Sequence, residues 1–88
     1  MSELDSIIDY PIDFPIKVMG LNRPEFTAAM TALVLRHAPD FDLTTIEVRP
    51  SREGRYLSLT MTIHATGREQ LDALYRELSD HPMVTMAL

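Results

Sequence analysis

The chain has 88 residues and a formal net charge of -5 at pH 7, with 13 acidic and 8 basic side chains. That length suffices for one domain with a modest core. Apolar residues make up 45% and charged residues 24% of the chain, as in ordinary globular proteins. The excess of carboxylates disfavours binding to nucleic acid or to an anionic membrane, so we expect neither as a partner.

Cysteine is absent from the sequence. Disulfides, thiol catalysis and thiolate metal sites are therefore excluded, and the lack of disulfides suits a reducing compartment. The apolar runs are of strand length, far below the roughly 20 residues that span a bilayer. The acidic start of the chain also differs from a secretory signal, which begins basic and continues apolar. We therefore expect a cytoplasmic protein.

Residues 1–13 are predicted to form an acidic lead-in, either partly ordered or packed as a short arm, before a single domain over residues 14–88. The domain opens with a strand at 14–20. Apolar Phe14, Ile16 and Val18 alternate there with Lys17 and Met19, and a period of two is typical of a half-buried strand.

A helix is predicted to follow, up to about His37. Asn22 has the side chain of a good N-cap, Pro24 suits a first turn, and Glu25 completes a capping box three residues after Asn22. Pro39 ends the helix. The stripe predicted to face the core comprises Phe26, Ala29, Met30, Leu33, Val34 and His37.

Two strands come next, at 41–50 and 55–65, separated by a polar turn at 50–54. In the first, Ile46 and Val48 are predicted to face the core. The second alternates strictly, which predicts one dry face and one open face. The dry positions are Leu57, Leu59, Met61, Ile63 and Ala65.

Thr66 and Glu69 form a second capping box, which predicts a helix to about Asp80. Its apolar side carries Leu71, Leu74, Tyr75 and Leu78. Residues 83–88 close the domain as a last strand.

The element order is thus βαββαβ, an α+β arrangement of the ferredoxin-like kind. Right-handed crossovers then predict a four-stranded antiparallel sheet of order 4-1-3-2 with both helices on one face.

Several short segments at fixed spacing resemble the YbeD-like family of small bacterial proteins of unknown function. They are Phe14-Pro15, Lys17-Val18-Met19-Gly20, Arg36-His37-Ala38-Pro39, Pro50-Ser51, Gly54-Arg55-Tyr56, and Met83-Val84 with Met86 and Leu88. The resemblance covers about residues 4–88. It implies a ferredoxin-like fold similar to ACT domains, the regulatory domains of amino-acid-metabolising enzymes, and no established activity.

The ACT likeness implies a ligand site where the first strand enters the first helix. ACT domains often carry an acidic or amide residue and then a Pro-Gly pair there. Asn22 and Pro24 match that pattern, whereas Glu25 stands in place of the glycine and departs from it. On the residues alone, two interpretations of Gly20, Asn22 and Arg23 stay open: a turn that holds an anion at a helix N-terminus, or a plain turn with a helix cap and a surface arginine.

The open sheet face is the second candidate surface. It is predicted to carry Lys17, Met19, Tyr56, Ser58, Thr60, Thr62 and His64, with Glu47 and Arg49 nearby. RNA-recognition domains need stacked aromatics on the two central strands, and Tyr56 is alone there. The hydroxyl-rich face therefore predicts either a solvated surface or a protein interface.

No catalytic residue, metal ligand set or cofactor is predicted. The three histidines, His37, His64 and His81, fall on different elements without metal-ligand spacing. Acylphosphatases share this fold and pair a loop arginine with an asparagine on a central strand, but Asn22 is the only asparagine and it lies in the loop.

The sequence therefore predicts a non-catalytic binding module of regulatory role, which acts through a protein partner or self-association by the open face. The alternative is a small-molecule sensor of ACT type, which binds an amino acid or metabolite at the turn of residues 20–23.

Overall fold

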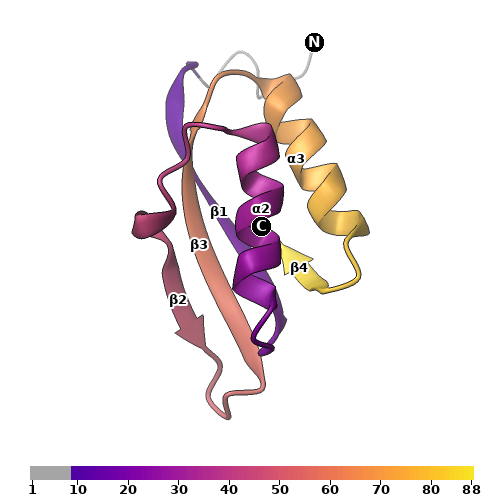
Figure 1. The fold of residues 1–88 in the computed structure, drawn as a ribbon. Helices are drawn as coiled ribbons and strands as arrows, with labels where there is room; N and C mark the ends of the chain where they lie inside the picture. The colour runs from indigo at the N-terminus through magenta and orange to yellow at the C-terminus, as the bar shows by residue number, and fades with distance from the viewer. Residues whose placement is uncertain (1–8) are drawn as a thin grey trace.

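The computed structural model describes residues 9–88, whose strands and helices follow one another in the order βαββαβ (Figure 1). The strands are β1 (Ile12–Leu21), β2 (Glu47–Pro50), β3 (Tyr56–Ala65) and β4 (Val84–Ala87). The helices are α2 (Phe26–His37), α3 (Arg68–Asp80) and a 3₁₀ turn at Leu43–Thr45. The predicted lead-in at 1–13 lies largely outside the described residues; β1 begins at Ile12, and Tyr10 packs against the core.

The four strands form one antiparallel sheet in the order β2-β3-β1-β4, which confirms the predicted topology. Both helices lie on the same side of the sheet, in front of it in Figure 1. Residues 9–88 place no helix on the opposite side, which we call the open face. The fold is thus the α+β βαββαβ architecture expected from the element order.

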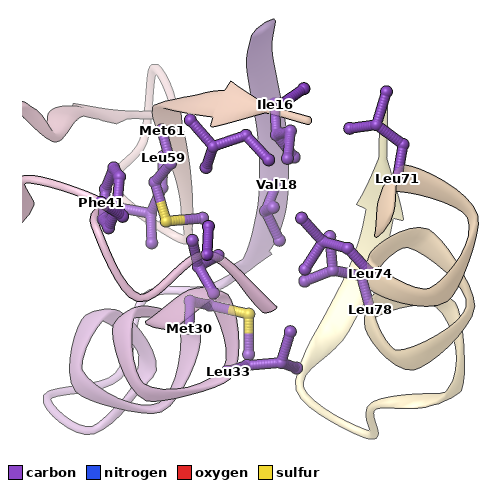
Figure 2. Packing of buried hydrophobic residues seen from close by; sticks show 14 of the residues in the cluster. Ile16, Val18, Met30, Leu33, Phe41, Leu59, Met61, Leu71, Leu74 and Leu78 are labelled. Carbon is purple, nitrogen blue, oxygen red and sulfur yellow. The ribbon is translucent and has the colours of Figure 1, made fainter. Parts of the chain in front are cut away.

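The core lies between the sheet and the two helices. Most of its members come from the predicted apolar positions, and Ala38 and Phe41, which were not predicted to face the core, are buried with them. Ile16 and Val18 from β1 meet Leu59 and Met61 from β3, all fully buried. Figure 2 shows these side chains converging with those of the helices, which contribute Met30, Leu33, Leu71, Leu74 and Leu78. Burial of apolar area on this scale is the main stabilising contribution to the domain.

An edge-to-face aromatic pair joins β1 to α3 beside this core. The rings of Phe14 and Tyr75 have centroids 6.5 Å apart and cross at 83°. Burial raises the pKa of the Tyr75 phenol, because the phenolate is poorly solvated there.

The strand predicted at 41–50 is wrong in its first half. The chain forms the 3₁₀ turn there instead, and strand pairing starts only at Glu47. The Asp42 carboxylate accepts hydrogen bonds from the hydroxyl and the backbone N–H of Thr44, and both hold the pKa of Asp42 below its usual range. This local cap competes with extended backbone, as Asp and Thr side chains commonly do.

Val48 does not enter the core, contrary to the prediction. It pairs with Leu59 and so lies on the helix-facing side of the sheet, yet it is 52% exposed. The two helices cover β1, β3 and β4 and leave the β2 edge bare (Figure 1). Ile46, at the inner end of the same segment, is half-buried against the core.

Both predicted capping boxes are also wrong. Asn22 and Glu25 make no side-chain cap on α2, and Thr66 and Glu69 make none on α3. Gln70 acts instead: its Oε1 accepts from the Thr66 backbone N–H at 2.8 Å, and its Nε2 donates to the His37 carbonyl at 2.8 Å. One side chain thereby links the start of α3 to the end of α2.

A second link between the helices is ionic. The Glu77 carboxylate on α3 pairs with Arg36 and with His37 in the last turn of α2. Together with Gln70, this cluster holds α2 against α3, while their apolar stripes face the sheet.

Gly20 is required where β1, α2 and the start of β4 converge. A Cβ at this position would collide with the Met83 carbonyl oxygen and lie 2.5 and 2.7 Å from the Phe26 ring. The sheet also carries a bulge here, between Met19 and Gly20, opposite β4. The glycine therefore allows close packing of three segments.

We expect Gly20→Ala to destabilise the domain by about 1–3 kcal/mol, because the added methyl group must displace backbone and a buried ring. Equilibrium urea unfolding measures the change. Gly67→Ser is the control, since a Cβ at Gly67 meets no atom within 4 Å and serine is a good N-cap. Equal unfolding midpoints for Gly20→Ala and the wild type would contradict the packing argument.

Candidate functional site

The register of the sheet arranges the open-face side chains in rows across the strands. Directly paired residues of neighbouring strands share a face. Lys17 pairs with Thr60, which pairs with Glu47, and Lys17 exchanges two backbone hydrogen bonds with Leu88. We call this set the Thr60 row: Glu47, Thr60, Lys17 and Leu88. The neighbouring Ser58 row comprises Arg49, Ser58, Met19 and Met86.

The predicted face residues are thus brought together as expected. Lys17, Thr62 and His64 are exposed, while Met19, Tyr56, Ser58 and Thr60 are half-buried by their neighbours. Arg55 lies over the Tyr56 ring, with its guanidinium carbon 5.9 Å from the centroid. The face is a continuous surface along the two ten-residue strands β1 and β3.

The charged side chains of the two rows lack ionic partners among the described residues. Within residues 9–88, Lys17, Glu47 and Arg49 make no ion pair. Further along the face, Nδ1 of His64 lies 3.7 Å from Oδ1 of Asp13. The two bases and two carboxylates of this face cancel, although the chain as a whole carries -5.

A polar groove of about 440 Å³ runs between β1 and β2 across these rows. Its lining residues are Lys17, Glu47, Val48, Arg49, Ser58 and Thr60. The hydroxyls of Ser58 and Thr60 form its floor, because β3 lies between the two flanking strands. The groove therefore offers hydroxyl groups and side chains of both charges to a molecule that covers it.

An apolar border flanks the groove on the β4 side. Met86 is 50% exposed and Leu88 65% exposed, and both lie beside β1. Leu21, 37% exposed, continues the border at the end of β1. Leu21 and Leu88 were not predicted as surface residues, although the period of two along the strands would have placed both on this face.

A separate pocket of about 230 Å³ lies at the end of the sheet, beside the entry into α2. It is lined by Leu21, Arg23, Phe26, Pro82, Met83 and Thr85. The lining is apolar except at two points. The Thr85 hydroxyl donates to the Met19 carbonyl at 2.9 Å, while Arg23 is exposed. The Arg23 guanidinium has no partner among the described residues.

The structure separates the three residues predicted to bind a ligand at this turn. Arg23 lines the pocket, Gly20 is buried beside the lining residues Phe26 and Met83, and the Asn22 side chain is directed elsewhere. The Asn22 side-chain amide donates to the Gly54 carbonyl at 2.9 Å, and its backbone N–H donates to the Arg55 carbonyl at 2.8 Å. Asn22 therefore holds the β2–β3 loop. Glu25, which departs from the ACT pattern, is not among the lining residues.

Phe26, Met83 and Thr85 were not predicted as site residues. Phe26 could have been suspected, because it follows Pro24 in the first turn of a helix beside the candidate loop. Met83 and Thr85 come from the other end of the chain, and only the pairing of β4 with β1 brings them here.

The histidines occupy three separate settings. His37 pairs with Glu77, His64 lies beside Asp13, and His81 accepts a hydrogen bond from the Met83 backbone N–H at 3.1 Å. Among residues 9–88, no three acidic or histidine side chains gather as a metal site would require. In that same part of the chain, neither helix is long and apolar enough to span a bilayer.

The sequence profile described as "Protein of unknown function (DUF493)" matches residues 5–88. The chain belongs to this family. A UPF0250 protein of Nitrosomonas europaea is 61% identical over 84 residues, which cover 96% of this chain and 97% of the relative. The resemblance to a family of unknown function is thereby confirmed, and the DUF493 domain spans nearly the whole chain.

Solved structures extend the comparison to the fold. The solution structure of HP0495 from H. pylori superposes with a TM-score of 0.74 at 16% identity, over 100% of this chain and 96% of that one. The ACT domain from the GTP pyrophosphokinase of Chlorobium tepidum gives a TM-score of 0.65 at 18% identity, over 86% and 84%. The ACT-like fold expected for this DUF493 member is confirmed.

We expect Asn22→Ala to loosen the β2–β3 loop and to leave α2 intact, at a cost of about 0.5–1.5 kcal/mol for the lost hydrogen bond. Amide hydrogen exchange measures both regions: protection should fall at residues 51–55 and stay unchanged in the first turn of α2.

Asn22→Asp is the matched control, because aspartate can cap a helix but cannot donate to the Gly54 carbonyl. It should behave like Asn22→Ala. If aspartate preserved protection while alanine frayed the first turn of α2, Asn22 would be a cap after all.

Proposed function

We propose that this protein is a non-catalytic binding module of regulatory role, which binds a protein through the open face of its sheet. One observation carries the proposal: Lys17, Glu47 and Arg49 stand around a hydroxyl-lined groove without ion pairs to the described residues of their own chain. Beside them lies an exposed apolar border. Protein interfaces bury apolar area together with polar groups that find partners across the contact, and this face offers both.

The mixture of signs supports a protein partner over nucleic acid. A phosphate backbone requires a cluster of bases, and here Glu47 and Asp13 offset Lys17 and Arg49. Among the described residues, the Ser58 and Thr60 hydroxyls of the groove make no hydrogen bond to Lys17 or Glu47, the contact that would activate a hydroxyl as a nucleophile. This supports a role in binding.

We expect Ser58→Arg to abolish recovery of the partner in quantitative affinity capture from cell extract. A long charged side chain at the centre of the groove would block close approach of the partner. Ser79→Arg, the same change at an exposed position of α3, is the matched control and should leave recovery unchanged. Circular dichroism verifies that both variants fold. Equal recovery with all three proteins, or no specific partner with any, would contradict the proposal.

A second candidate function rests on the pocket beside α2. An exposed guanidinium at the rim of a pocket walled by Phe26, Leu21 and Met83 suits a small carboxylate with an apolar side chain. The Arg23 guanidinium would pair with the carboxylate, and the apolar walls would cover the remainder of the ligand. This arrangement supports the sensor alternative, with Arg23 as its principal polar residue.

We expect one member of a panel of amino acids and other small carboxylates to raise the melting temperature saturably. At one hundred times its Kd a ligand stabilises by about 2.7 kcal/mol. Each kcal/mol corresponds to roughly 4–8 °C in a domain of this size. Arg23→Gln should remove the shift, whereas Arg52→Gln in the exposed loop should retain it. No shift with any compound, or an undiminished shift in Arg23→Gln, would exclude this second function.

A further inference from the structure

We propose that a second copy of this chain covers the open face, sheet against sheet, about a two-fold axis that crosses the strands between the Ser58 row and the Thr60 row. The inference rests on the proposed function and names the partner. It follows from the side chains that such an axis would bring together.

This axis places the Ser58 row of one copy over the Thr60 row of its partner, and the Thr60 row over the partner's Ser58 row. Strand β2 then lies over the second copy's β2, and Glu47 faces the partner's Arg49. The same operation places Arg49 opposite the partner's Glu47, because a two-fold interface uses every contact twice. Two residues that lack ion pairs in one described domain thereby form two ion pairs between copies.

The remaining positions of the two rows also match. Ser58 faces the partner's Thr60, so hydroxyl meets hydroxyl at the centre of the interface. At the β4 side, Met86 faces the partner's Leu88, and the two most exposed apolar side chains of the face leave water together. Lys17 faces the partner's Met19, against which its aliphatic stem can lie while the ammonium stays hydrated.

Axes that run along the strands match less well. One through the centre of the sheet would lay β2 over the partner's β4 and press Glu47 and Arg49 onto Leu88 and Met86. Another along β3 would pair Lys17 with the partner's Glu47 but leave the apolar border on β4 uncovered. Of these three axes, only the crossing axis pairs Glu47 with Arg49 and Met86 with Leu88. Face-to-face sheets normally pack about 10 Å apart at roughly 30°, an offset that long Glu and Arg side chains can bridge.

The size of the face implies a dimer that dissociates on dilution. Because the axis crosses β1 at Val18, only residues 15–21 of β1 and 56–62 of β3 lie over their counterparts in the partner, a length of about 23 Å. With about 14 Å between the axes of the outer strands, the planar footprint is roughly 320 Å², below the roughly 800 Å² per partner of standard interfaces. Self-association must therefore be followed across a concentration series.

The test is analytical ultracentrifugation of the full chain, as wild type, Glu47→Arg, Arg49→Glu and an equimolar mixture of the two variants. Wild type should show a monomer–dimer equilibrium. Each variant alone should dimerise at least tenfold more weakly, because like charges then face each other across the axis. The mixture should recover dimers, since Glu47→Arg carries two bases and Arg49→Glu two carboxylates at the facing positions.

The mixing experiment distinguishes ion pairs between copies from ion pairs within one chain. Neither variant alone has opposite charges at positions 47 and 49, so dimers in the mixture require contact between the two variants. Arg52→Glu, a charge reversal in the exposed β2–β3 loop, is the control and should dimerise like wild type. A wild type that stays monomeric at every concentration, or a mixture no better than its components, would overturn the proposal. Affinity capture with Ser58→Arg tests the proposed function separately. If the wild type stays monomeric but Ser58→Arg still fails to recover a protein that the wild type captures, self-association is refuted and binding through the open face stands.

Discussion

Ten consecutive residue pairs between β1 and β3 hold the centre of this sheet, and the rest of the structure depends on them. From Ile12 opposite Ala65 to Leu21 opposite Tyr56, the register contains no bulge. Every second pair is apolar and points toward the helices, and the pairs between them point to the open face. A slip of one residue would exchange the two faces completely. The burial of Ile16, Val18, Leu59 and Met61 therefore determines the register, and with it the neighbours of every polar side chain on the other face.

The strands that flank β1 and β3 differ in how far the helices cover them. On the β4 side, α3 packs over the edge and a bulge lets Thr85 reach the Met19 carbonyl. On the β2 side the helices do not reach, so Val48 stays half in solvent and the strand is only four residues long. Short, charged strands are a usual protection of sheet edges against unwanted pairing. Glu47 and Arg49 give the β2 edge this charged character and also supply the charges of the groove.

The two candidate surfaces share the same end of β1 but differ in character. The pocket beside α2 is small and apolar with one guanidinium, which suits a small anion with an apolar part. The open face is broad and carries both signs of charge, which suits a protein surface. Leu21 borders both, since it ends the open face and lines the pocket. A ligand in the pocket would therefore lie in contact with the edge of the proposed interface, which gives a direct physical route for one to influence the other.

Local chemistry in the sequence determined the strands, the helices and the two faces of the sheet, because the periods of 2.0 and 3.6 are set by the backbone itself. It determined the members of the open face and the apolar positions that form the core. Family membership also followed from residues at fixed spacing. Only the tertiary structure decided which distant segments those residues meet. Asn22 donates to a carbonyl 32 residues away instead of capping its helix, Gln70 displaces the predicted box at Thr66, and Val48 lies beyond the reach of α2. A polar side chain pairs with the best partner within reach, and for each of these residues that choice depends on how separate elements pack, which no local pattern records.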